Sequence, residues 1–141
     1  MSELVHRVRV FVFRIQDRWP LYLLLRSAQG IEGFWTPIHG PIRFDEKLEG
    51  AIRREVAEDI GVTRFGELID LRMPARWVLG DEEVIEWSYG IHADPTAGPL
   101  RLAGERWAEY LWAPFGRAFP ALELEHDRAA ILRLHATLGA A

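Results

Sequence analysis

Apolar and polar residues alternate near the start of the chain, and this period of two predicts a β-strand. Over residues 8–13, valine at every second position alternates with arginine and phenylalanine, so both faces of the strand are largely apolar. The stretch 16–18 suits a turn, and a second strand is predicted over 21–26. The stretch 74–83, with its proline, glycine and acids, is predicted to be a loop. Further strands are predicted over 34–38, 65–73, 84–93 and within 102–112.

The period changes over residues 45–61, which predict an amphipathic helix. Leucine, isoleucine and valine recur at every fourth position over 48–60 and form one apolar side that should contact the core. Asp45 is the expected N-cap of this helix, and Gly61 is its expected C-terminal stop.

A second helix is predicted over 128–138, with Asp127 as its cap. Strands interspersed with two helices predict a mixed sheet covered on both faces, and hence an α/β fold class. At 141 residues the chain is long enough to bury a core, and we expect one domain over 1–141.

Charge and composition narrow the function classes. The formal net charge of −4 disfavours a surface for duplex nucleic acid, which is normally basic. The absence of cysteine excludes disulfides and thiolate metal sites. The longest purely apolar run, 21–25, is far below the ~20 residues that span a bilayer, and the N-terminus lacks the apolar segment of a signal peptide. We therefore expect a cytoplasmic protein that does not bind membranes.

Three carboxylates are crowded together on the first predicted helix. Glu55, Glu58 and Asp59 stand at i, i+3 and i+4, so their side chains project within about one turn of one another. Like charges at this spacing repel, and a divalent cation would offset the repulsion. Hard oxygen donors suit Mg²⁺ or Mn²⁺, which would also let a negatively charged diphosphate approach. Taken alone, such a triad is more often a solvated acidic face.

These acids belong to a longer pattern that begins at Gly40. Five residues separate Gly40 from Glu46, and seven more separate Glu46 from Arg54-Glu55, which is followed by Val-Ala-Glu-Asp-Ile-Gly-Val. The pattern resembles the Nudix box, the signature of hydrolases that split a nucleoside diphosphate linked to another group. This resemblance implies an α/β/α sandwich, with a mixed sheet between helices, over essentially the entire chain.

The resemblance also implies a metal site. It makes ligands of Glu55, Glu58 and Asp59. The main-chain oxygen of Gly40 or of its neighbour His39 would assist them. Either Glu55 or Glu58 would serve as the base that activates water. Asp59 departs from the pattern, since Glu is usual there, and its shorter side chain predicts weaker binding at one metal position.

Three further residues complete the site that the resemblance implies. Arg54 would tie the loop carboxylates together, and Glu46 would support the helix start through hydrogen bonds. Downstream, Glu105 followed by 109–112 and 127–131 resembles the subgroup with dATP and dihydroneopterin triphosphate pyrophosphohydrolases. Glu105 would be an extra metal ligand or base, with a plain surface carboxylate as the equal alternative.

Four residues are candidates for substrate binding. Arg26 and Arg76 would hold phosphates through bidentate hydrogen bonds. Arg43 would also meet a phosphate, although a solvent-exposed arginine is the commoner role. Trp77, in the predicted loop, is the best candidate for stacking on a base, a contact of about 1–3 kcal/mol where it occurs. Most tryptophans, however, are packing residues.

The sequence thus predicts a Mg²⁺-dependent pyrophosphohydrolase (with Mn²⁺ as the alternative ion) for a small nucleotide substrate. A nucleoside triphosphate or related metabolite would yield a monophosphate and pyrophosphate. One alternative keeps the site but acts on a dinucleoside polyphosphate, a nucleotide sugar or capped RNA, because the box contacts metals and phosphates rather than the attached group. Another is a nucleotide-binding module without turnover. The oligomeric state is left open, a homodimer included.

Overall fold

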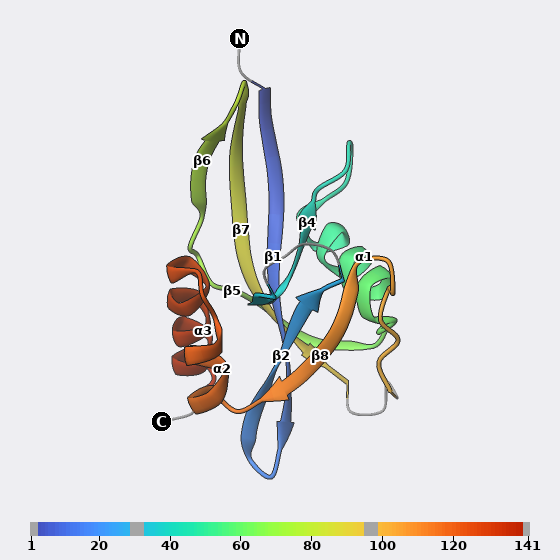
Figure 1. Cartoon of the computed structure of the whole chain (residues 1–141), viewed down its shortest axis with the longest axis vertical. Coiled ribbons are helices and arrows are strands. Elements are labelled where there is room, and N and C mark those ends of the chain that lie inside the picture. The colour runs from blue at the N-terminus through green and yellow to red at the C-terminus, as the bar shows by residue number, and fades with distance from the viewer. Residues whose placement is uncertain (1–2, 29–32, 95–98, 140–141) are drawn as a thin grey trace.

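Two long strands run side by side through the middle of the protein (Figure 1). The computed structural model describes residues 3–28, 33–94 and 99–139. Strands β1 (Glu3–Gln16) and β7 (Glu82–Ala93) are parallel, in a register that pairs Phe13 with His92. The other described strands extend the sheet outward from the two edges of this pair, either directly or through β2.

The attached strands make the sheet mixed. They are β2 (Trp19–Ser27), β3 (Trp35–Thr36), β4 (Ile38–Pro41), β5 (Phe65–Asp70), β6 (Ala75–Leu79) and β8 (Trp107–Ala113). β4 and then β2 pair with β1, while β6 and then β5 pair with β7, and β3 and β8 pair with β2. Among the described strands only β1 and β7 are parallel to each other.

Helices cover both faces of this sheet. Helix α1 (Leu48–Ile60) lies on one face, and α2 (Phe115–Ala121) and α3 (Glu125–Thr137) lie on the other (Figure 1). The alternation along β1 supplies both contacts, because its valines pack in the α1 core and its phenylalanines pack in the core with α2 and α3. The predicted α/β/α sandwich is confirmed. None of the helices in the described residues is long and apolar enough to cross a membrane.

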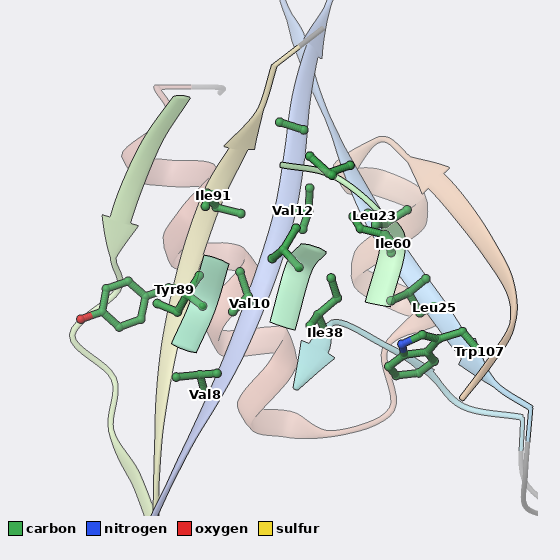
Figure 2. Packing of buried hydrophobic residues seen from close by; sticks show 14 residues of the cluster. Val8, Val10, Val12, Leu23, Leu25, Ile38, Ile60, Tyr89, Ile91 and Trp107 are labelled. Carbon is green, nitrogen blue, oxygen red and sulfur yellow. The ribbon is translucent and has the colours of Figure 1, made fainter. Parts of the chain in front are cut away.

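The core under α1 fixes the rotation of that helix. Ile52, Val56 and Ile60 are fully buried. Figure 2 shows Val8, Val10 and Val12 in a row along β1, and Ile60 and Trp107 belong to the same cluster. Each such side chain contributes about 1.5–3 kcal/mol when removed from water. The helix positions beside this apolar stripe are therefore held at the edge of the core.

Both predicted N-caps are wrong. α1 begins at Leu48 with Lys47 as N-cap, and Asp45 lies in the preceding turn with φ of 61°. α3 begins at Glu125, so Asp127 lies inside its first turn, where it pairs with an arginine of the sheet. The predicted stop at Gly61 is confirmed, since this residue has φ of 73° and its N–H donates to the Ala57 carbonyl.

Two elements were not predicted. The stretch expected to be a loop contains β6, a largely exposed strand that pairs with β7 across a turn at Gly80. Its pairing with a long neighbour overrides the local loop composition. Helix α2 was missed because it is short and contains Pro120, which argues against a helix. The other strands are present with shifted ends, and the one expected over 34–38 is interrupted at Pro37.

A buried ion pair connects the sheet to α3. Arg9 of β1 donates from Nε and Nη2 to the two carboxylate oxygens of Asp127 at 2.7 and 2.6 Å. Both residues are buried, and Glu86 of β7 lies 3.6 Å from Arg9 Nη1 as a second acidic partner. This bidentate geometry fixes the start of α3 over the sheet.

We expect Asp127→Ala to lower the free energy of unfolding by about 3–5 kcal/mol, because it leaves Arg9 as a buried charge without its bidentate partner. Replacing the whole cluster, with Arg9→Met, Glu86→Leu and Asp127→Leu, should recover much of this loss. Urea unfolding at pH 7 measures both effects. The control is Arg53→Gln, which breaks an exposed pair with Glu49 on α1 and should change stability by less than about 1 kcal/mol. A comparably small effect of Asp127→Ala would contradict this account.

Candidate functional site

Two acids of α1 are buried beside the core. Glu55 and Asp59 are each only 3% exposed, because they flank the apolar stripe of the helix. The side chain of Glu58, between them in the sequence, is 49% exposed. An isolated buried carboxylate is strongly disfavoured, so Glu55 and Asp59 require cationic or hydrogen-bonding partners.

Gly40 brings strand β4 close to these acids. It pairs with Val8 in the β1–β4 ladder, and a Cβ atom added to it would collide with the Glu55 carboxylate. Its φ is not positive, so the glycine is required for space rather than for backbone conformation. The close approach places the main-chain carbonyl of His39 near Glu55 and Asp59. The guanidinium of Arg106 contacts this carbonyl and both acids.

Arg54 joins the loop before α1 to the helix. Its Nε and Nη2 donate to the two carboxylate oxygens of Glu46 at 2.7 and 2.9 Å. Nη2 also donates to the Pro41 carbonyl at 2.9 Å. Nη1 donates to Glu55 Oε1 at 3.1 Å and to Glu58 Oε2 at 3.3 Å. One guanidinium thus orients three carboxylates from two segments.

The pairing with Arg54 changes the titration of Glu46. The bidentate hydrogen bond from Arg54, assisted by the main-chain N–H of Arg43, lowers the pKa of Glu46 from 4.5 to about 2. The same pairing raises the pKa of Arg54. Glu46 is therefore ionised at neutral pH and serves as the anchor of the loop.

A second guanidinium, that of Arg106, lies between the buried acids. Its Nη1 donates to Glu55 Oε2 at 3.2 Å and to Asp59 Oδ1 at 3.4 Å, and its Nη2 donates to the main-chain oxygen of His39. Asp59 Oδ2 lies 3.2 Å from Nη1 but accepts no hydrogen bond from the described residues. The Arg106 side chain is 36% exposed, so it reaches the acids from the solvent side.

The electrostatics of the site favour a positive charge between Glu55 and Asp59. Burial raises the pKa of Asp59, and the charge of Arg106 opposes that rise. Burial, together with the charges of Arg9, Arg106 and Arg7, lowers the pKa of His39 to about 3. The imidazole is therefore neutral at pH 7, and the positive charge beside the acids comes from guanidinium groups.

The oxygens that meet here are suited to a hard divalent cation. Carboxylates and main-chain carbonyls, which meet here, are donors that Mg²⁺ and Mn²⁺ prefer. Within residues 3–28, 33–94 and 99–139, no three acidic or histidine side chains are grouped closely enough to hold a metal. Glu58, the third acid, pairs instead with Arg43 and Arg54. A divalent cation would therefore have to be held by Glu55, Asp59 and the His39 carbonyl, the three groups that the Arg106 guanidinium contacts.

Comparison with known families agrees with this geometry. The profile of the NUDIX domain matches residues 5–134, which is most of the chain. The chain belongs to the Nudix family. The prediction of a Nudix hydrolase is confirmed at this level, and hydrolases of the family generally use divalent metals such as Mg²⁺. No significant match was found among curated protein sequences.

Solved Nudix structures share the fold over nearly the whole chain. A protein from Listeria monocytogenes described as a NUDIX hydrolase is 17% identical with a TM-score of 0.81, covering 95% of this chain and 94% of that one. The E. coli dihydroneopterin triphosphate pyrophosphohydrolase is 18% identical with a TM-score of 0.75, covering 96% of each chain. The NUDIX domain of Shewanella oneidensis NrtR, complexed with ADP ribose, is 17% identical with a TM-score of 0.75, covering 98% and 89%. At these identities the likeness shows the fold alone.

Glu105 and Arg43 are two further residues that the sequence predicts for the site, and both are exposed. Glu105, the downstream acid predicted as an extra ligand or base, is exposed, and the side chain of this turn that reaches the buried acids is its neighbour Arg106. The role of Glu105 stays a prediction. Arg43 lies at the exposed rim, where its Nη2 donates to Glu58 Oε1 at 3.3 Å.

Two arginines predicted to bind phosphates have acidic partners outside the Nudix box. Arg26 donates to Glu109 Oε1 at 2.5 Å, and its guanidinium lies 4.5 Å from the Trp35 ring centre. Arg76 of β6 pairs with Glu83 of β7 at 3.1 Å. Both pairs are on the surface and contribute little to stability, so their roles in phosphate binding remain predictions.

Sequence reasoning missed Arg106. Its contacts join it to residues 47, 51 and 67 positions away, so no local spacing reveals them. The available signal was charge, because crowded acids require cations and an arginine directly follows Glu105.

We expect Gly40→Ala to destabilise the protein by about 1–3 kcal/mol, the range for inserting a methyl group into packed surroundings. The added Cβ would push the Glu55 carboxylate away from its present position. Thermal and urea unfolding measure the effect. Gly104→Ala, where no heavy atom lies within 4 Å of the added Cβ, is the matched control. Equal stabilities of the two variants would contradict the close approach.

The lowered pKa of Glu46 predicts a pH dependence. A carboxylate with a folded-state pKa below its unfolded value stabilises the fold above the unfolded pKa, and this stabilisation is lost as the pH falls through the folded pKa. Stability of the wild type should therefore fall between pH 4.5 and about 2, more steeply than that of Glu46→Gln. Glu49→Gln controls for removal of an exposed carboxylate on α1. Parallel wild-type and Glu46→Gln curves in acid would refute the prediction.

Proposed function

We propose that this Nudix protein is a Mg²⁺-dependent pyrophosphohydrolase of a nucleoside triphosphate or related metabolite, with Mn²⁺ as an alternative ion. The observation that carries the proposal is the convergence of two buried carboxylates, Glu55 and Asp59, and the His39 carbonyl on one cation position. Burial raises the pKa of Asp59, and ionisable groups with shifted pKa values cluster at functional sites.

Glu55, Asp59 and the main-chain oxygen of His39 or Gly40 would hold the ion, with Glu58 at the exposed rim. When bound, such an ion neutralises charge on phosphoryl oxygens and lowers the pKa of an attacking water. Arg54 positions Glu55 and Glu58 by hydrogen bonds, and Glu46 holds Arg54 in place. Either Glu55 or Glu58 would accept the proton of the attacking water.

The organic part of the substrate has a candidate pocket on the sheet. A cavity of about 460 Å³ is lined by Trp77, by Arg9 and Glu86 of the sheet, and by the start of α3. Trp77 lies on β6 rather than in the predicted loop, and it is 39% exposed, so one face is available for stacking. The cavity lies on the α3 side of the sheet, where Arg9 binds Asp127, and Arg9 is the register partner of His39 of β4.

The site does not by itself select among diphosphate compounds. Structures of the same fold include the dihydroneopterin triphosphate pyrophosphohydrolase of E. coli and an Ap4A hydrolase of C. elegans, the latter 16% identical with a TM-score of 0.73. We favour a nucleoside triphosphate or related metabolite because the downstream residues resemble the first of these. A dinucleoside polyphosphate, a nucleotide sugar or capped RNA remains the alternative substrate.

A second candidate is a nucleotide-binding module without turnover. The observation that favours it is the Arg106 guanidinium, which satisfies the buried acids without a metal. Under this alternative a nucleotide would bind, and its phosphate chain would stay intact after long incubation.

Incubation of the protein with a nucleotide panel and Mg²⁺, followed by separation of products, tests the proposal. We expect a monophosphate and pyrophosphate, and a loss of kcat/KM on the order of 10²-fold or more in Glu55→Gln, as for removal of a group that stabilises transition-state charge. Glu49→Gln, an exposed acid of the same helix, should keep full activity. Failure to cleave any diphosphate-containing compound in the presence of metal would reject the proposal.

A further inference from the structure

The cation position of the site is filled by a side chain of the protein itself. The Arg106 guanidinium contacts one oxygen of Glu55, both oxygens of Asp59 and the His39 carbonyl. These are the same oxygens that would ligate a divalent ion. The acids are 3% exposed, so their repulsion is poorly screened, and Arg106 is the cation that they share.

A guanidinium and a divalent ion cannot share this position. Mg²⁺ requires oxygens at about 2.0–2.1 Å, whereas Arg106 Nη1 already lies 3.2 Å from Glu55 Oε2 and 3.2 Å from Asp59 Oδ2. An ion bound to those oxygens would therefore lie within a few ångströms of the guanidinium. Two positive centres so close in a buried setting repel strongly.

The local structure lets the side chain leave while the backbone stays. The Arg106 N–H donates to the Ala103 carbonyl at 2.9 Å, and the Arg106 carbonyl accepts from the Ala28 N–H at 2.9 Å. Ala103 in turn donates to the Asp59 carbonyl at 2.9 Å, which ties the turn to α1. The guanidinium lies 5.0 Å from the ring centre of buried Trp107 and is partly exposed. Rotation about side-chain bonds alone would carry it into solvent.

We propose that Arg106 is a displaceable internal cation of the Nudix site, which holds Glu55 and Asp59 together in the metal-free protein and competes with the divalent ion. The inference rests on the proposed metal-dependent function. It predicts that the wild-type protein binds Mg²⁺ or Mn²⁺ more weakly than its acids would allow, and that the metal-free fold needs Arg106.

Isothermal titration with Mn²⁺ and thermal unfolding with and without Mn²⁺ test the competition in Arg106→Gln. We expect Mn²⁺ to bind to Arg106→Gln roughly tenfold more tightly than to wild type, or better. In this variant the metal no longer has to break the hydrogen bonds between Arg106 and the acids, and a tenfold change in affinity corresponds to about 1.4 kcal/mol. The metal-free variant should melt at a lower temperature than wild type. Mn²⁺ should raise its melting temperature more than that of wild type.

Arg53→Gln is the matched control, because it removes one positive charge from α1 and leaves every contact of the site intact. It should bind Mn²⁺ as the wild type does. Arg106→Lys, which keeps the charge but not the forked contacts, should have intermediate affinity.

A measurement on the wild type does not depend on folding of the variants. In NMR spectra of the wild type with ¹⁵N-labelled arginines, the side-chain Nε–H signal of one arginine should become that of a mobile side chain as Mg²⁺ saturates the site. Equal Mn²⁺ affinity in wild type, Arg106→Gln and Arg53→Gln, or arginine signals unchanged at saturating Mg²⁺, would overturn the role of Arg106 and leave the metal-dependent function standing. Absence of metal binding in every variant would reject both, and tight binding in Arg106→Gln alone would support the competition.

Discussion

The burial of two neighbouring carboxylates on α1 is the constraint on which the rest of the site depends. Glu55 and Asp59 lie one helical turn apart at the edge of the core, where water screens them poorly. Positive charge has to offset their repulsion. Arg54 of α1 and Arg106 of the turn before β8 supply this charge. The loop before α1 is thus tied to Glu55 through Arg54, and the turn before β8 is tied to both Glu55 and Asp59 through Arg106.

Hydrophobic packing places the acids, and main-chain hydrogen bonds place their partners. The stripe of Ile52, Val56 and Ile60 sets the rotation of α1, which holds Glu55 and Asp59 at the edge of the core with little exposure to water. The end of the helix binds the turn before β8 through the carbonyls of Asp59 and Ile60. Any change in the packing of α1 would therefore move the acids and Arg106 together.

Local sequence patterns predicted the elements of this arrangement but not its long-range pairings. The spacing of acids and glycines over 40–62 identified α1, its stop at Gly61 and the residues of the box, because these depend on neighbours within a few turns. The cap at Asp127 was wrong because this residue pairs with Arg9 from inside α3, and the cap at Asp45 was wrong because the residue lies in a turn with φ of 61° before α1. Strand β6 was missed for a similar reason, since the edge of β7 orders a stretch with loop composition. Arg106 was missed because its hydrogen bonds to Glu55, Asp59 and the His39 carbonyl cross the fold.

The Arg9–Asp127 pair and the Arg106 contacts with Glu55 and Asp59 both involve buried acids, but they differ in their geometry. In the Arg9–Asp127 pair both partners are buried, and two hydrogen bonds of 2.6–2.7 Å use both carboxylate oxygens, so the pair is closed to any other cation. The Arg106 contacts with carboxylates are longer, at 3.2–3.4 Å, and divided among several acceptors. They end on a side chain that is 36% exposed. A guanidinium held in this way is bound strongly enough to keep the acids together, yet it has a route to solvent. The second cluster, unlike the first, is therefore built for exchange of its cation.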